Sequence, residues 1–168
     1  RWATDGAPEE RNAHPHVCNE SVAVVHNGII ENHAKLREEQ AKRGYSFTSD
    51  TVTEVIVHAV HDAISSGDNL LKAVQKATLQ LEGAYALGVV SDQEPGRLVA
   101  ARQGSPLVIG LGIGEYFIAS DVAALLPVTN RFVFLEEGDL ADLSRENIRI
   151  YDRQGKEVQR EVKLSSLT

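Results

Sequence analysis

The sequence predicts an α+β fold built mainly from antiparallel sheet. Segments with helical periodicity lie between about residues 31 and 82, and after Gly83 the chain becomes a series of short strand-like segments. Turn residues separate those segments, as in antiparallel meanders. Helices and strands that segregate along a chain in this way are typical of α+β proteins, whose helices pack on the faces of their sheets.

Composition limits the possible classes of protein. The chain has 168 residues, enough for one domain with a sizeable core. Its formal net charge of −7 argues against nucleic acid or an anionic membrane surface as the main partner. The longest apolar runs are strand-sized, so we expect no membrane span, and the single cysteine, Cys18, excludes an internal disulfide. With no visible signal peptide, these features predict a cytoplasmic protein.

The first part of the chain predicts a loop, a strand and a turn. It begins with Arg1 and contains no Met, so we interpret it as a fragment or a processed piece. Residues 1–20 are rich in Gly, Pro, His and Asn and predict a loop region, whereas the β-branched stretch Val22–His26 predicts an interior strand. A sharp turn then presents the Asn27 side chain beside the Gly28 backbone N–H. Two such donors can hold an oxyanion, and the polar helical segment that follows argues against a plain Asn-Gly hairpin.

Three helical segments complete residues 21–82. Glu31–Arg43 is strongly charged and predicts a surface helix that ends at Gly44. Thr51 and Glu54 have the spacing of a capping box, which opens a second helix with one apolar face. That face consists of Val52, Val55, Ile56, Ala59, Val60, Ala63 and Ile64. A third helix, with Asp68 as its cap, buries Leu70, Leu71, Val74, Ala77, Thr78 and Leu81.

Residues 84–163 predict a meander of strands. We expect residues 1–163 to form one domain and residues 164–168 to form a tail. One short helix, Asp121–Leu126, interrupts the strands and ends at Pro127. The expected strands are Ala84–Val90, Arg97–Ala101, Leu107–Leu111, Tyr116–Ala119, Arg131–Leu135, Asp139–Leu143, Ile148–Tyr151 and Glu157–Val162.

Six motifs occur in one order along the chain. They are RWATDG (1–6), NAHPH (12–16), VHNGIIEN (25–32), GSPLVIG (104–110), IASD (118–121) and FLEEGD (134–139). From about Arg1 to Val162 the sequence closely resembles the glutaminase domains of glutamine–fructose-6-phosphate aminotransferases. These domains are class II glutamine amidotransferases with the N-terminal-nucleophile hydrolase fold.

The resemblance implies both an architecture and a reaction. The fold would be an αββα sandwich of two mainly antiparallel sheets, here incomplete at the N-terminus. The reaction would be hydrolysis of the glutamine side-chain amide, with the ammonia delivered to a sugar isomerase domain of the parent protein to aminate fructose 6-phosphate. Glutamine or glutamate is the expected ligand, and we expect no cofactor, no metal, no nucleic acid and no membrane partner.

The resemblance also assigns roles to individual residues. Arg1 would pair with the α-carboxylate of the substrate, a task that suits a bidentate guanidinium. Trp2 would pack at the gate of the site, and Thr4 would hydrogen-bond the substrate. The side-chain amide of Asn27 and the backbone N–H of Gly28 would form the oxyanion hole.

Three departures from the family pattern predict that this chain alone does not hydrolyse glutamine. The family uses an N-terminal Cys as its nucleophile, whereas residue 1 is Arg and Cys18 lies within the chain. Asp5 stands where the family usually carries His, and its charge would repel a carboxylate substrate. Val52 replaces the Asp that binds the substrate ammonium. The alternative hypothesis is a non-catalytic scaffold or binding domain that kept the fold and lost the glutamine pocket.

Two other clusters suggest chemistry but have simpler explanations. One face of the second helix has His and carboxylate spacing that can bind Zn²⁺, yet every amphipathic helix has a polar face opposite its apolar stripe. That face consists of Glu54, His58, His61 and Asp62. His16 lies two residues from Cys18, but no third group of a nucleophilic site is evident. We therefore expect neither a metal site nor a Cys–His nucleophile.

Overall fold

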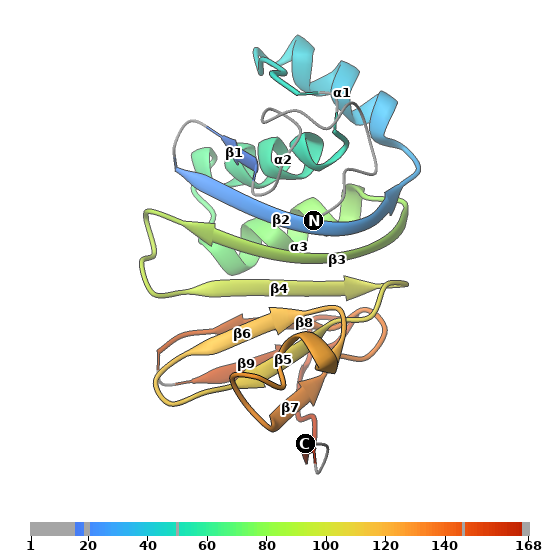
Figure 1. The fold of residues 1–168 in the computed structure, drawn as a ribbon. Helices are drawn as coiled ribbons and strands as arrows, with labels where there is room; N and C mark the ends of the chain where they lie inside the picture. Colours follow the sequence, from blue (N-terminus) through green and yellow to red (C-terminus); the bar gives the residue numbers. More distant parts are fainter. Residues whose placement is uncertain (1–15, 19–20, 50, 146, 166–168) are drawn as a thin grey trace.

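The structure of the chain, a computed structural model, describes residues 16–18, 21–49, 51–145 and 147–165 (Figure 1). Its helices each lie within a segment that the sequence predicts to be helical. They are α1 (His33–Lys42), α2 (Thr53–Ser65) and α3 (Leu70–Gln80). No helix in these described ranges is both long enough and apolar enough to cross a membrane.

Among the described residues the strands form two sheets, and every pair of neighbouring strands is antiparallel. The larger sheet has the order β1 (His16–Cys18), β2 (Val22–Ile30), β3 (Gly83–Ser91), β4 (Leu98–Gln103), β8 (Leu140–Leu143), β9 (Ile148–Tyr151), β10 (Glu157–Val158). The smaller sheet has the order β11 (Val162–Leu164), β7 (Arg131–Phe134), β5 (Val108–Leu111), β6 (Tyr116–Ala119). The smaller sheet therefore comes entirely from the meander that the sequence predicts, whereas the larger sheet combines strands of that meander with β1 and β2.

The elements stack in layers, with a core in each interface. Helices α2 and α3 cover one face of the larger sheet, and the smaller sheet packs on the other face (Figure 1). The helix–sheet core includes Val24 of β2, Ile56 of α2 and Val74 of α3, all fully buried. The core between the sheets includes Ala100, Ile109 and Leu143. Full burial of one such aliphatic side chain contributes about 1.5–3 kcal/mol, so these two interfaces dominate the stability.

The α+β fold class with two antiparallel sheets is confirmed. On the outer face of the smaller sheet, the described residues contribute the 3₁₀ helix Val122–Ala124, next to a small cluster of Val108, Leu125 and Phe132. This 3₁₀ helix is shorter than the predicted helix Asp121–Leu126. The division into a domain at 1–163 and a tail stays a prediction.

Two other elements differ from the sequence prediction. Part of the expected loop region is a strand, because His16–Cys18 pairs with Val22–Val24 as β1. The expected strand Glu157–Val162 is in fact two strands that belong to different sheets, β10 at its start and β11 from Val162 onward. Strands of two or three residues carry too little periodic pattern to be recognised from sequence.

The predicted helix caps are also partly wrong. The N-cap of α2 is Val52, and Glu54 does not close a capping box with Thr51. Its carboxylate instead accepts hydrogen bonds from the preceding loop, as described below. The N-cap of α3 is Asn69, whose side chain accepts a hydrogen bond from the Lys72 N–H, so Asp68 is not the cap.

Asn32 fixes the chain that leaves β2. Its Nδ2 donates to the Gln80 carbonyl at 2.7 Å, and its Oδ1 accepts from the Glu82 N–H at 3.0 Å. The Glu31 N–H adds a backbone bond to the Glu82 carbonyl at 2.7 Å. One amide side chain therefore joins the end of β2 to the connection between α3 and β3.

Replacing Asn32 with Ala is expected to lower the free energy of unfolding by about 1–2 kcal/mol, because both side-chain bonds are lost. Asn32→Asp keeps the acceptor for Glu82 but places a carboxylate oxygen against the Gln80 carbonyl, so it should be no more stable than Asn32→Ala. Urea denaturation followed by circular dichroism measures both. Unchanged stability in both variants would show that these bonds make no net contribution.

Candidate functional site

The segment Asn27–Gly28 lies inside β2, not in a turn after it. The strand runs to Ile30, and its register with β3 pairs Asn27 with Ala86 and Gly28 with Tyr85. The prediction of a sharp turn at this point is therefore wrong. Gly28 has φ of +120°, so the strand keeps its pairing while the backbone adopts a conformation that other residues rarely adopt.

The positive φ of Gly28 accompanies a very close approach of β3. A Cβ built on Gly28 would lie 2.2 Å from the Ala84 carbonyl oxygen, well inside van der Waals contact. Only glycine fits here, because the obstacle is backbone of the neighbouring strand. Ala84 is distant from Gly28 in the sequence. The local Asn-Gly pattern therefore predicted a hairpin turn that the contact with β3 rules out.

A cavity of about 490 Å³ lies beside this segment. It opens where the edge strand β6 of the smaller sheet meets β2 and β3 of the larger sheet. Its lining consists of Val25, His26, Asn27, Ala86, Leu87, Gly88, Leu107, Ile118, Ala119 and Ser120. A mainly apolar hollow with a few polar groups is the usual form of a small-ligand site.

Three of the motifs that carry the family resemblance converge on this cavity. Asn27 comes from VHNGIIEN, Leu107 from GSPLVIG, and Ser120 from IASD. The Asn27 side chain is exposed and supplies two N–H donors at the wall. The sequence analysis assigned no role to Leu107 or Ser120. Both residues lie in motifs that carry the family resemblance, and this was the one indication that they could belong to the site.

The other predicted site residues are not brought together with Asn27 by the described structure. Arg1, Trp2, Thr4 and Asp5 lie outside the described residues. Val52 is the N-cap of α2 and is only 7% exposed, packed in the core between the helices and the larger sheet. It does not line the cavity, which fits its interpretation as part of the apolar face of α2.

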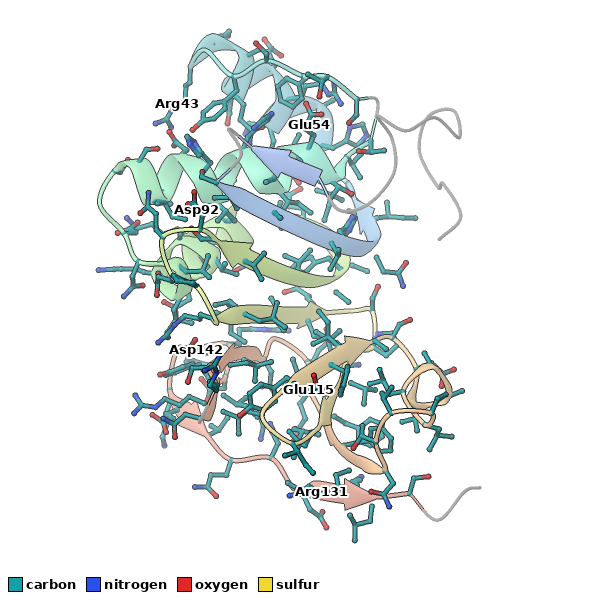
Figure 2. All side chains as sticks on the ribbon, turned by 60° about the vertical axis from the view of Figure 1, so that its left-hand side comes forward. Arg43, Glu54, Asp92, Glu115, Arg131 and Asp142 are labelled. Carbon is teal, nitrogen blue, oxygen red and sulfur yellow. The ribbon has the colours of Figure 1, made fainter. Side chains whose placement is uncertain are left out.

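The loop before Val52 is held by buried hydrogen bonds to Glu54. The Glu54 carboxylate is 3% exposed and accepts from the Thr48 and Ser49 N–H groups, each at 3.0 Å. Its Oε2 lies 3.4 Å from Nε2 of His58. Arg37 of α1 adds bonds to the carbonyls of Ser49 and Thr51. Glu54, labelled in Figure 2, lies in the first turn of α2.

These contacts lower the pKa of Glu54. Burial by itself raises the pKa of this carboxyl, but hydrogen bonds from His58, Ser49 and Thr48 outweigh it and hold the pKa below its usual value. Because the folded pKa lies below the unfolded one, the stabilisation is present above the unfolded pKa. It is lost as the pH falls through the folded pKa.

Glu54→Gln is expected to lower the free energy of unfolding at neutral pH by about 2–3 kcal/mol, since an amide cannot accept all of these bonds. The loss should shrink as the pH falls from the unfolded pKa of Glu54 through its lower folded pKa, where the wild-type carboxylate also becomes protonated. Urea denaturation across this pH range measures it. The control is Glu38→Gln, because Glu38 is 73% exposed and pairs only at the surface with Lys42. It should change stability by less than about 0.5 kcal/mol at any pH, and an equal effect of both variants would contradict the argument.

The residues of the possible zinc face have other partners. Nδ1 of His61 lies 2.8 Å from the hydroxyl oxygen of Tyr45. The Asp62 carboxylate forms an ion pair with the Arg43 guanidinium, with Oδ2 and Nη2 2.9 Å apart. In the part of the chain that the structure describes, no group of three or more His, Cys, Asp and Glu is placed to hold a metal ion. Nothing is described of the side chains of His16 and Cys18.

Sequence comparison connects this geometry to known proteins. Residues 4–127 match a family model described as a glutamine amidotransferase domain. The chain is 58% identical over 168 residues to a glutamine–fructose-6-phosphate aminotransferase (isomerizing) of Shewanella oneidensis, covering 100% of this chain and 28% of that protein. It is also 58% identical over 161 residues to the enzyme of the same name from Escherichia coli K12, covering 96% of this chain and 26% of that protein. The chain therefore spans only about a quarter of the length of these curated relatives.

Solved structures share the fold. A glutamine phosphoribosylpyrophosphate amidotransferase from Bacillus subtilis superposes with a TM-score of 0.74 at 24% identity, over 88% of this chain and 33% of that chain. A structure described as the allosteric regulatory enzyme of purine biosynthesis gives a TM-score of 0.73 at 23% identity, over 88% of this chain and 32% of that one. These likenesses establish the architecture, and the family match establishes the lineage. The chain belongs to the glutamine amidotransferase domain family.

Proposed function

We propose that this chain is the glutamine-hydrolysing part of an enzyme that transfers the amide nitrogen of glutamine to fructose 6-phosphate. The observation that carries the proposal is the meeting of three family motifs around one cavity, with Asn27 on its wall. The 58% identity to aminotransferases with this activity in their name supports it. In the parent protein, a sugar isomerase domain would receive the ammonia.

The proposed chemistry needs a donor pair near a carbonyl oxygen. In this proposal the thiol of an N-terminal Cys of the parent protein would attack the side-chain amide of glutamine and turn its carbonyl oxygen into an oxyanion. The proton of the thiol would pass to the amide nitrogen, which leaves as ammonia, and water would hydrolyse the remaining thioester to glutamate. The Nδ2 of Asn27 and the N–H of Gly28 would donate to that oxyanion, which is where preorganised donors accelerate acyl transfer most. This chemistry requires neither a metal nor a redox cofactor.

The remaining substrate contacts belong to the N-terminal loop in this proposal. Arg1 would hold the α-carboxylate of glutamine, Trp2 would close the site, and Thr4 would hydrogen-bond the ligand. Of the three departures from the family pattern, Asp5 and Val52 are the two that should weaken the binding of glutamine. We place the reaction in the cytoplasm, in keeping with the low cysteine content of the chain.

The test is isotope transfer by the parent protein. Glutamine labelled with ¹⁵N in its amide is supplied with fructose 6-phosphate, and the products are analysed by mass spectrometry. The expected products are glutamate and a ¹⁵N-labelled amino sugar phosphate in equal amounts. If no glutamate forms, and calorimetry detects no binding of glutamine or glutamate, the proposal is wrong and the chain is a scaffold that lost its pocket.

A further inference from the structure

A buried polar pair joins β2 to the first turn of α2 immediately beside the candidate oxyanion hole. Nδ1 of His26 lies 3.1 Å from Oγ1 of Thr53. The two side chains are 4% and 1% exposed, respectively. Around them, the layer between β2 and the helices is mainly apolar, with Val24, Val55 and Ile56 among its members. A directional bond within an apolar interface fixes relative position in a way that packing alone does not.

The hydrogen bond between His26 and Thr53 acts next to a part of β2 that contains a glycine with positive φ. β1 pairs with β2 only at Val22–Val24, so in the described structure the ladder beyond Val24 is formed with β3 alone. Within that single ladder, Gly28 and Gly83 both have positive φ, of +120° and +121°. Glycine backbone is the most conformationally free, so a side-chain bond at His26 restricts this stretch of β2 further than the described ladder does.

The alternation of side chains along a strand connects the pair to the cavity. The His26 side chain is buried against α2, and the next residue, Asn27, points to the opposite face and lines the cavity. A displacement of His26 along the strand would therefore carry Asn27 and Gly28 with it. On the helix side, Thr53 is adjacent to Glu54, which is anchored by the loop bonds described above.

We propose that His26, through its bond to Thr53, is a positioning residue that holds Asn27 and Gly28 at the place where the oxyanion forms. This inference rests on the proposed function. A misplacement of about 1 Å in a catalytic group can cost as much as 100-fold in rate. For loss of this one hydrogen bond we expect a fall in kcat of about tenfold, with KM changed by less than about twofold.

The experiment compares three hydroxyl variants in the parent protein. Thr53→Val has the same shape without the hydroxyl, and Thr53→Ser keeps the hydroxyl. The control is Thr129→Val, because the Thr129 hydroxyl donates to the Leu111 carbonyl at 2.7 Å, away from β2. Ammonia release from glutamine should fall about tenfold in kcat for Thr53→Val. It should stay within about threefold of wild type for Thr53→Ser and for the control.

A second measurement does not depend on activity. Amide hydrogen exchange on the present chain, followed by NMR, should be about tenfold faster at Asn27, whose backbone pairs with Ala86 of β3, in Thr53→Val than in the control. Exchange at Val89, in the middle of β3, should be the same in both variants. A local change of this kind would separate positioning from a general loss of stability.

The outcomes distinguish the two proposals. If the wild-type parent releases no ammonia, the proposed function fails, and exchange at Asn27 alone decides whether the pair positions the strand. If the parent is active but Thr53→Val matches the control in kcat, or raises only KM, the positioning role is wrong. Unchanged exchange at Asn27 would overturn it as well. Rescue by Thr53→Ser in both measurements supports it.

Discussion

Gly28→Ala is expected to lower the free energy of unfolding by at least about 3 kcal/mol, a large share of the stability of a typical domain. A residue with a Cβ at φ of +120° is strained by about 1–2 kcal/mol before any contact is considered. The added Cβ would also lie 2.2 Å from the Ala84 carbonyl oxygen and 2.9 Å from the Tyr85 Cα. Both obstacles are backbone atoms, so the strain can be relieved only by separating β2 from β3.

The facing strand shows the same close approach, which makes the effect harder to relieve. A Cβ on Gly83 would lie 2.3 Å from the Ile29 carbonyl oxygen, and Gly83 pairs with Ile30. Gly28 on β2 and Gly83 on β3 thus each leave room for the backbone of the opposite strand, so the two strands can lie unusually close together at this end. Moving one strand away from a new Cβ would break the ladder that carries Asn27.

Gly67→Ala is the matched control for this prediction. Gly67 has φ of +106° but no atom within 4 Å of a built Cβ, so its replacement adds backbone strain without a clash. We expect a loss of about 1 kcal/mol. Urea denaturation of the two variants measures the difference, and equal losses would mean that the contact with Ala84 contributes nothing.

The parts of the fold that follow from local pattern were predicted well. The apolar face of α2 repeats with helical period over 13 residues, and burial of Val55, Ile56 and Val60 follows directly. The strand Tyr116–Ala119 has the predicted bounds because turn residues flank it on both sides. The type and bounds of such elements can be predicted from the sequence, because they depend mainly on residues that are close together in the chain.

The parts decided by distant contacts were not predictable from the residues alone. Asn27–Gly28 has the strongest local signal for a hairpin turn, yet it continues a strand because Ala84 lies against it. Glu54 has capping-box spacing with Thr51, yet its carboxylate bonds to Thr48 and Ser49 instead. In both cases a tertiary contact overrides a local preference.

The cavity illustrates the same limit for the candidate site. Its walls combine Asn27, Leu107 and Ser120, which periodicity and composition give no reason to place together. The family resemblance is based in part on the motifs that contain these three residues, but it assigned a role in the site only to Asn27. The walls of a site built from two sheets become visible only when the sheets are packed.

Asn27→Ala is expected to lower kcat for glutamine hydrolysis by the parent protein by about 100- to 1,000-fold. An oxyanion donor acts mainly in the transition state, so KM should change little. Because the Asn27 side chain is exposed, the free energy of unfolding should stay within about 0.5 kcal/mol of wild type. Steady-state measurement of glutamate formation, together with urea denaturation, separates these two effects.

Ile29→Ala serves as the control, since Ile29 lies two residues further along β2 and is 72% exposed. It should keep kcat within about threefold of wild type, because no donor is lost. A rise in KM with kcat unchanged in Asn27→Ala would mean that Asn27 binds glutamine equally in the ground state and the transition state. That result would remove it from the oxyanion hole and leave it as a wall of the binding cavity. A loss of kcat equal to that of Ile29→Ala would remove Asn27 from the chemistry altogether.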